Sequence, residues 1–150
     1  VLWFANEIFP IILKKYPDIK WHVVGNKPTE EIKNLASDNI IVEGFVSDEK
    51  LEQLYNSCRM AVVPLRVGAG VKGKIVEASY YQVPVVTTDV GAEGISSEEK
   101  ALIVENDAGK MAEMICSLYE DYDAARERKL IENHYLLKNA MDVLKEDMDK

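Results

Sequence analysis

The residues with the clearest chemical potential lie in a basic, glycine-rich stretch near the middle of the chain. Residues 53–76 contain no Asp or Glu, although the whole chain carries 26 acidic against 18 basic residues and a net charge of −8. Backbone N–H groups of a glycine loop and of a helix N-terminus attract anions, and lysine adds a full positive charge. The stretch therefore predicts a phosphate or pyrophosphate site, formed by Arg66, Gly68, Ala69, Gly70, Val71, Lys72 and Lys74. A solvated surface loop is the alternative, because the pattern is neither a Walker loop nor G-x-G-x-x-G.

Glu77 follows this loop, near the start of the helix that the loop is expected to begin. A carboxylate beside a phosphate site would be repelled unless it binds something else. Ribose hydroxyls are one such partner, as for the acidic residue of dinucleotide-binding folds. An ordinary acidic residue favoured by the helix dipole explains the same position. The residues alone leave both interpretations open.

No other set of residues has the pattern of a familiar catalytic or metal centre. The sequence contains no H-E-x-x-H, no Ser-His-Asp order and no metal-type spacing of its two cysteines, Cys58 and Cys116. His22 falls inside an apolar strand, where a core or edge role is expected, and His134 falls in a charged helix, where exposure is expected. We therefore predict no metal site, and reduced thiols of the kind found in the cytosol.

Length and composition indicate one ordinary folded domain. The chain has 150 residues, enough to bury a core without disulfides or metal. Its 47% hydrophobic and 29% charged residues exclude disordered and low-complexity classes. The acidic excess argues against nucleic acid or an anionic membrane as a general partner. No apolar run approaches the roughly 20 residues that a membrane span needs.

Strands and helices are expected to alternate along the chain. Short Val- and Ile-rich runs predict strands, while apolar periodicity and the capping residues Thr29, Ser47 and Asn106 or Asp107 predict helices. The expected strands are 21–25, 40–42, 60–64, 83–87 and 101–104, and the expected helices are 2–16 (with a kink or late start at Pro10), 30–37, 48–57, 73–81, 108–120 and 122 to the end.

This order predicts an α/β fold, a doubly wound parallel sheet of about five strands with helices on both faces. The nearly continuous apolar character of the strands indicates burial on both faces. Ligands of such sheets bind at the carboxyl ends of the strands, near the topological switch point. A ligand is therefore expected among loops 25–29, 44–47, 64–73 and 88–95.

An ordered set of short segments makes the expectation more specific. The segments are Ile41-Val42-Glu43-Gly44-Phe45-Val46, Leu54-Tyr55, Ala61-Val62-Val63-Pro64-Leu65-Arg66, Gly68-Ala69-Gly70-Val71-Lys72, Glu77-Ala78, Pro84-Val85-Val86-Thr87-Thr88 and Gly91-Ala92-Glu93-Gly94-Ile95. Together they resemble the C-terminal, donor-binding domain of group 1 glycosyltransferases, retaining enzymes of GT-B architecture. The resemblance covers nearly all of the chain and implies a Rossmann-like half of such an enzyme. It implies sugar transfer from a UDP- or GDP-linked donor, with retention at the anomeric carbon and without metal or other cofactor.

The resemblance also implies roles for individual residues. Glu77 matches the second glutamate of the family's paired-glutamate motif, which holds the donor ribose. The loop from Gly68 to Lys72 matches the segment that lies against the diphosphate and the sugar. Gly44, Phe45 and Val46 match the turn that lines the base.

Two positions depart from the family pattern. The family's first glutamate, which touches the transferred sugar, is replaced by Ala69, so sugar recognition is expected to differ or to lie elsewhere. Gln82 stands where the family commonly has glycine at a helix end. A left-handed conformation there would cost a non-glycine residue about 1 kcal/mol.

The resulting hypothesis treats residues 1–150 as a donor-binding domain that lacks its first strand and the N-terminal acceptor domain. Because transfer needs the cleft between two domains, the piece alone is expected to bind nucleotide weakly and to catalyse nothing. Its expected partners are a nucleotide sugar and its own acceptor domain, in the cytoplasm or at the inner face of the membrane, with any peripheral membrane contact made by the acceptor domain. A sugar-nucleotide epimerase domain and a non-catalytic nucleotide-sugar-binding module are the alternatives.

Overall fold

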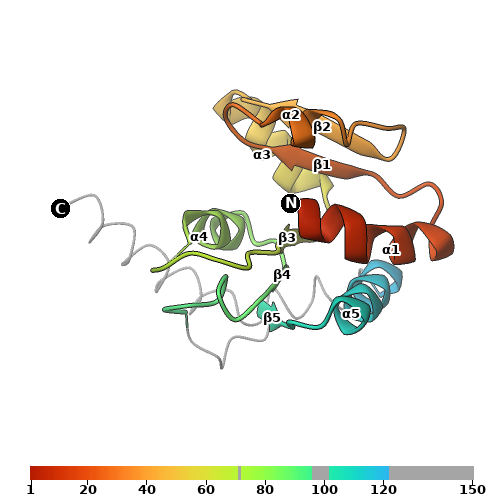
Figure 1. The fold of residues 1–150 in the computed structure, drawn as a ribbon. Helices are drawn as coiled ribbons and strands as arrows, with labels where there is room; N and C mark the ends of the chain where they lie inside the picture. The colour runs from red at the N-terminus through yellow and green to blue at the C-terminus, as the bar shows by residue number, and fades with distance from the viewer. Residues whose placement is uncertain (71, 96–101, 122–150) are drawn as a thin grey trace.

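Helices and strands alternate as predicted in a computed structural model, which describes residues 1–70, 72–95 and 102–121 (Figure 1). The elements are the π-helical turn η1 (Phe4–Ile8), α1 (Phe9–Lys15), β1 (Trp21–Val24), α2 (Glu30–Lys33), β2 (Ile40–Gly44), α3 (Asp48–Ser57), β3 (Ala61–Val63), α4 (Gly73–Tyr80), β4 (Val85–Thr87), β5 (Leu102–Val104) and α5 (Ala108–Glu120). The helix expected from residue 122 onward lies outside the described residues. The predicted order of elements is thus confirmed up to residue 121.

Side-chain caps begin three of the helices where the sequence predicts them. Thr29, Ser47 and Asp107 each accept a hydrogen bond from the backbone N–H three positions ahead, at the starts of α2, α3 and α5. Each cap satisfies one of the N–H groups that a helix leaves unpaired at its first turn. α2 is shorter than expected, ending at Lys33 after a single turn.

The first helix changes character just before Pro10. The N–H of Phe9 donates to the carbonyl of Phe4, five residues back, so η1 is a π-helical turn. Pro10 has no N–H to donate and its ring crowds the preceding turn, which is the reason for an irregularity at this point. The predicted disturbance at Pro10 is therefore accommodated by a wider turn without breaking the helix.

A left-handed residue ends α4, as the sequence predicts. Gln82 has φ +62°, its N–H donates to Ser79, and the N–H of Val83 donates to Ala78. These two bonds form a Schellman motif, in which the residue after the helix adopts the left-handed conformation that favours glycine.

Within the described residues, five parallel strands form two hydrogen-bonded sheets. One sheet has the order β1-β2, and the other has the order β3-β4-β5. All pairings are parallel, with Trp21 opposite Ile40 in the first sheet and Ala61 opposite Val85 in the second. Figure 1 shows β1 and β2 on one side of the molecule and β3, β4 and β5 on the other. The predicted strands are confirmed, but within the described residues no hydrogen bond joins β1 to β3.

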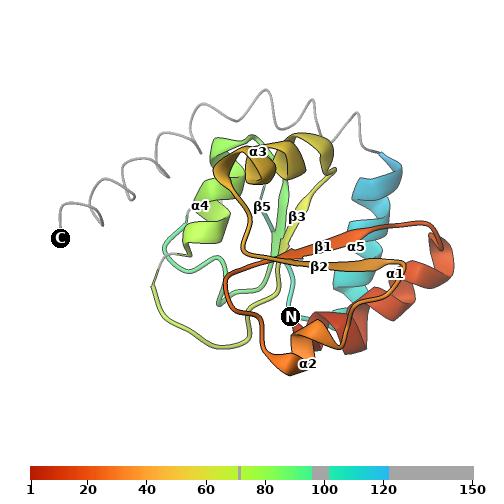
Figure 2. The ribbon, with the colours of Figure 1, turned by 90° about the horizontal axis from the view of Figure 1, so that it is seen from above.

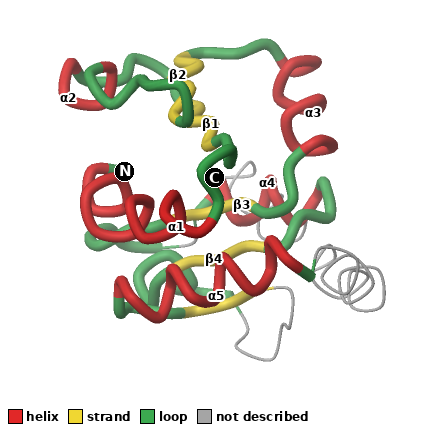
Figure 3. The backbone as a smooth tube through the Cα atoms, turned by 90° about the vertical axis from the view of Figure 1, so that its right-hand side faces the viewer, coloured by secondary structure: helices red, strands yellow, loops and turns green. Residues whose placement is uncertain are grey.

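Helices cover both faces of the three-stranded sheet. Val86 of β4 packs with η1, α1 and α5, whereas Val85 packs with Ile75 and Ala78 of α4. Successive residues of a strand point to opposite faces, which explains why these neighbours join different clusters. Figure 2 shows α4 and α5 on opposite sides of β3 and β5, and Figure 3 shows α5 lying along β4. The expected burial on both faces thus holds for β4 but not for β1, where His22 is exposed.

Candidate functional site

Two threonines gather the loops at the carboxyl edge of the three-stranded sheet. The Thr87 hydroxyl donates to the carbonyl of Val63 at 2.7 Å, and the Thr88 hydroxyl donates to the carbonyl of Leu65. Gly91 lies so close that a Cβ there would stand 1.8 Å from Thr87 Oγ1. The loop after β3 and the loop after β4 are therefore held together, as expected for the ligand-binding edge of an α/β sheet.

The glycine loop after β3 has a backbone that requires its glycines. Gly68 has φ +134° and Gly70 has φ +79°, in the region that side chains with a Cβ rarely adopt. Ala69 between them is exposed. Val71, which the sequence also assigns to the site, lies outside the described residues. The sequence thus places glycine where the left-handed turns occur.

A carboxylate occupies the anion-binding groups of this loop. Glu93 Oε2 accepts a hydrogen bond from the Gly70 N–H at 3.1 Å and lies 3.7 Å from Lys72 Nζ. The same Lys72 ammonium donates to the Gly70 carbonyl at 2.6 Å, and its side chain is only 13% exposed. Glu93 is 52% exposed and comes from the loop after β4. A negative charge therefore already lies where the sequence predicts a phosphate.

Sequence reasoning did not assign a role to Glu93. It stands within the Gly91–Ile95 segment of the resemblance, but no residue spacing connects it to position 70. The Thr87 and Thr88 contacts, with the Glu93 contacts themselves, bring the two loops together. The proximity of Glu93 to Gly70 is therefore evident from the tertiary structure and not from the sequence.

Glu77 is half-buried on α4, and one of its oxygens is already engaged. The Tyr55 hydroxyl donates to Glu77 Oε1 at 2.7 Å, and the Tyr55 ring stacks on Tyr81 with ring centroids 4.9 Å apart. Burial, and then the hydrogen bond to Glu77, raise the pKa of Tyr55 well above its ordinary value. Tyr55 therefore stays protonated and donates to one carboxylate oxygen, which orients the other.

Lys74 links α4 to the carboxyl end of the two-stranded sheet. Its ammonium donates to the Val24 carbonyl at 3.3 Å, and it is the nearest group to a Cβ placed on Gly25, at 3.9 Å. The Gly25 N–H in turn donates to the Gly44 carbonyl. Through these contacts the helix that carries Glu77 and the turn after β2 share one edge of the molecule.

The turn after β2 has the features of an open surface. Gly44 has φ +67°, which favours glycine, and Phe45 is 79% exposed, while Val46 is half-buried. An exposed aromatic ring next to a conformationally special glycine provides a flat apolar surface. Among the residues that the structure describes, no hydrogen bond or ring contact joins this turn to the glycine loop.

Two arginines of the basic stretch lie away from the glycine loop. Arg66 stacks over the Trp3 ring, with Cζ 4.4 Å from the ring centroid. Arg59 precedes β3, so it lies at the amino end of that strand, where it donates to the Tyr119 carbonyl at 2.7 Å. Lys74 and Glu77 line one cavity, whereas the Lys72 ammonium turns to Gly70 and Glu93. The basic stretch therefore does not form one cluster.

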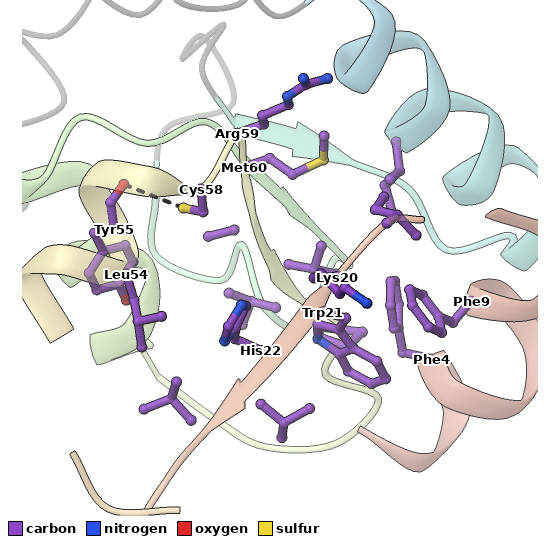
Figure 4. Close-up of a pocket in the computed structure, with 18 of the residues that line it drawn as sticks. Phe4, Phe9, Lys20, Trp21, His22, Leu54, Tyr55, Cys58, Arg59 and Met60 are labelled. Atoms are coloured by element: carbon purple, nitrogen blue, oxygen red, sulfur yellow. Dashed lines mark hydrogen bonds between the residues drawn. The ribbon is translucent and has the colours of Figure 1, made fainter. Parts of the chain in front are cut away.

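A cavity of about 480 Å³ lies between the two sheets, and Glu77 and Lys74 are among the residues that line it. Figure 4 shows Trp21 and His22 of β1 on one side, with Leu54, Tyr55, Cys58 and Met60 around it. Phe4 and Phe9 of the first helix close another part of the wall. The walls are mostly apolar, and the charged lining residues are Asp18, Lys20, Arg59, Lys74 and Glu77.

Neither a metal centre nor a membrane helix is found within residues 1–70, 72–95 and 102–121. No group of three or more His, Cys, Asp or Glu side chains in these ranges could hold a metal ion. No helix in them is both long and apolar enough to cross a membrane. His22 pairs with one carboxylate, that of Glu43, at 2.7 Å.

Comparisons with known proteins agree on the family and the fold. Residues 1–121 match the family model described as "Glycosyl transferases group 1". Over 135 residues the chain is 30% identical to the "Uncharacterized 44.6 kDa protein in cps region" of Klebsiella pneumoniae. This alignment covers 85% of this chain and 35% of the Klebsiella protein. The crystal structure of TarM matches with a TM-score of 0.72 at 18% identity, over 99% of this chain and 31% of TarM. The chain thus spans about a third of the length of these proteins.

Proposed function

Because the chain belongs to the group 1 glycosyl transferases, we propose that it is the part of a glycosyltransferase that binds the sugar donor, a UDP- or GDP-linked sugar. The single observation that carries this proposal is the oriented Glu77 carboxylate. One oxygen accepts from Tyr55, and the side chain lines the cavity next to Lys74 at the carboxyl edge of the strands. A fixed carboxylate beside lysines suits a ligand that presents hydroxyls next to phosphates.

Different groups of the site are proposed to bind different parts of the donor: its ribose, its diphosphate and its base. The second oxygen of Glu77 accepts from the ribose hydroxyls. The N–H groups of the glycine loop and of the α4 N-terminus, with Lys72 and Lys74, hold the diphosphate. The turn from Gly44 to Val46 lines the base, because Phe45 offers an exposed ring for stacking.

Glu93 marks the place of a diphosphate oxygen in this proposal. Its carboxylate accepts from the Gly70 N–H and lies near Lys72, the two groups that a phosphate would use. A donor diphosphate carries more negative charge than one carboxylate, so it would displace Glu93 into solvent.

The chemistry of transfer would rest on charge stabilisation. As the bond to the sugar breaks, negative charge grows on the departing diphosphate, and N–H groups with lysines fixed beside it lower the barrier. The family resemblance is the basis for proposing that the transfer retains the configuration of the anomeric carbon. We place the acceptor-binding part and any membrane contact in the rest of a longer, cytoplasmic protein.

A panel of nucleotides tests the donor assignment on the full-length protein. UDP, GDP, ADP and their sugars are compared by thermal shift, together with the free nucleosides. One diphosphate should raise Tm clearly and its nucleoside little, since the charged part contacts the lysines. If the nucleoside and the nucleoside diphosphate raise Tm equally, the assignment of the lysines to the diphosphate must be withdrawn. Product analysis separates the epimerase alternative, because an epimerase changes the donor without an acceptor.

A further inference from the structure

Each end of β3 carries an arginine that stacks on an aromatic ring. Arg59 precedes the strand, and its Cζ lies 4.1 Å from the centroid of the Tyr119 ring on α5. Arg66 follows the strand, and its Cζ lies 4.4 Å from the centroid of the Trp3 ring. A guanidinium over an aromatic face is held both by its charge and by its flat shape. The two stacks therefore tie β3 to α5 at its amino end and to the start of the first helix at its carboxyl end.

The Trp3 ring belongs to a well-packed part of the molecule. Trp3 is partly buried and packs against the buried cluster that includes Phe4 and Ile8, and its backbone is helical. Figure 2 shows the N-terminus close to the loop that leaves β3, and the stack of Arg66 on Trp3 joins the two. A ring that is already ordered loses little conformational freedom when an arginine stacks on it. Trp3 is thus a fixed platform for the side chain that begins the glycine loop.

The loop itself has little packing of its own. Residues 66–70 are all exposed, and their two glycines add conformational freedom. Among the described residues, side chains from other segments hold this stretch at two points. The Trp3 ring contacts Arg66 at one end, and Glu93 accepts from the Gly70 N–H at the other.

These two attachments differ in what a bound diphosphate does to them. In the proposed function the diphosphate takes the Gly70 N–H and displaces Glu93. The stack of Arg66 on Trp3 uses neither the Gly70 N–H nor Lys72, so a ligand on those groups leaves the stack in place. Groups that are arranged before binding bind more tightly, because less freedom is lost on binding. The attachment at Trp3 is therefore the one that arranges the loop for the ligand.

We propose that Trp3 is a positioning residue for the diphosphate of the donor. Its ring holds the Arg66 guanidinium, and Arg66 in turn holds the glycine loop in the conformation that presents the Gly70 N–H. The inference rests on the proposed function for the identity of the ligand, whereas the position of the loop does not depend on it. An exposed cation–π stack accounts for an expected change of about 2- to 5-fold in the equilibrium that opens the loop.

Hydrogen exchange of the Gly70 amide tests the position of the loop without any ligand. In the full-length protein, Trp3→Leu keeps an apolar side chain but removes the aromatic face, and Arg66→Lys keeps the charge but removes the flat guanidinium. Each variant should speed exchange of the Gly70 amide about 2- to 5-fold. Arg59→Lys weakens the matched stack at the other end of β3 and should leave this rate unchanged. An unchanged rate in Trp3→Leu, or an equal increase in Arg59→Lys, would overturn the proposal.

Calorimetry with UDP and GDP tests the consequence for binding. The Kd of the diphosphate that the wild-type protein binds should rise about 2- to 5-fold in Trp3→Leu, while Trp3→Phe, which retains an aromatic face, should restore the wild-type value. A Trp3 that serves only the packing of the first helix would instead lower Tm in Trp3→Leu without changing Kd, and that result would overturn the proposal.

A double variant tests whether Trp3 acts through Arg66. Trp3→Leu combined with Arg66→Lys should weaken diphosphate binding no more than Trp3→Leu alone, because both changes break the same contact. Losses that add would overturn the proposal, since they assign independent roles to the two residues. If the wild-type protein binds no nucleoside diphosphate, the proposed function fails, and exchange of the Gly70 amide still decides whether Trp3 positions the loop.

Discussion

Strands β4 and β1 each contain two adjacent valines, but their surroundings are very different. All three residues of β4, Val85 to Thr87, are buried, whereas β1 is half-buried and exposes His22. β4 has a strand on each side and helices on both faces, but β1 has one strand neighbour within the described residues. A valine-rich run thus indicates a strand, while its neighbours decide how rigid and how buried it is.

The difference extends to the candidate site, which spans both parts. The glycine loop, Glu77 and Glu93 belong to the three-stranded part and are tied by hydrogen bonds. The turn at Phe45 belongs to the two-stranded part and is open. Matched substitutions in the two parts therefore separate effects on packing from effects on binding.

The largest effect is expected from adding one methyl group at the carboxyl edge. In Gly91→Ala the new Cβ would overlap Thr87 Oγ1 and lie 3.2 Å from the Val63 carbonyl, so buried groups must move. Overpacking of this kind costs about 1–3 kcal/mol or more, a fall in Tm of roughly 5–10 °C by thermal denaturation. The control Gly25→Ala meets nothing nearer than 3.9 Å and should change stability by less than about 0.5 kcal/mol. An equal loss of stability in the two variants would contradict the prediction that only Gly91 is tightly packed.

Substitution of two carboxylates that form hydrogen bonds of equal length tests whether Glu77 binds the donor. Glu77 accepts from Tyr55 at 2.7 Å, and Glu43 pairs with His22 at 2.7 Å. Glu77→Gln should lower donor-dependent kcat/KM of the full-length enzyme about 10- to 150-fold, since a charge-assisted bond contributes roughly 1.5–3 kcal/mol. Tm should change little, and Glu43→Gln should leave turnover unchanged. If Glu77→Gln unfolds the domain while the folded fraction turns over normally, the ribose role is withdrawn.

Glu93 is predicted to compete with the ligand. Glu93→Gln removes a negative charge from Gly70 and Lys72, so the affinity for the preferred nucleoside diphosphate should rise about 3- to 10-fold, measured by calorimetry. The exposed pair of Glu30 and Lys33 gives the control Glu30→Gln, with no change expected. A loss of affinity for the nucleotide sugar, with diphosphate affinity unchanged, would assign Glu93 to the sugar instead.

Alkaline pH should weaken the packing around Tyr55. The pKa of Tyr55 is raised in the folded protein, so its contribution is complete below the unfolded value of about 10 and is lost as pH rises above that value. Tyr55→Phe should therefore flatten the fall of Tm above pH 10. Tyr80, an exposed tyrosine of α4, supplies the control variant Tyr80→Phe, which should leave the slope unchanged. Identical slopes in all three proteins would rule out this role for Tyr55.

The smallest effects are expected at the two non-glycine residues with positive φ. Gln82 at φ +62° ends α4, and Lys27 at φ +49° follows β1. Gln82→Gly should raise stability by about 0.5–1 kcal/mol, because glycine adopts the left-handed conformation without strain. In the same denaturation experiment, Lys27→Gly should raise stability by no more than Gln82→Gly does. A destabilised Gln82→Gly variant would show that the glutamine side chain contributes packing.

Local features were predictable because they depend on neighbouring residues. The caps at Thr29, Ser47 and Asp107, the turn at Gln82 and the disturbance at Pro10 each follow from hydrogen bonds or sterics within a few positions. The family resemblance likewise followed from segments in order, and the family match confirms it. The roles of Glu77 and the loop residues stay predictions.

By itself, the sequence determined the alternation of helices and strands, their caps and the glycines of the loop, since each is decided by short-range geometry. Tertiary structure alone decided that Glu93 accepts from the Gly70 N–H and that Tyr55 donates to Glu77. It likewise decided that Arg66 stacks on Trp3 and that Arg59 donates to the Tyr119 carbonyl. It also decided that five parallel strands form two sheets with a cavity between them. These side-chain contacts join residues 22 to 63 positions apart. No periodicity or spacing specifies which distant loops the packing of a sheet will bring together.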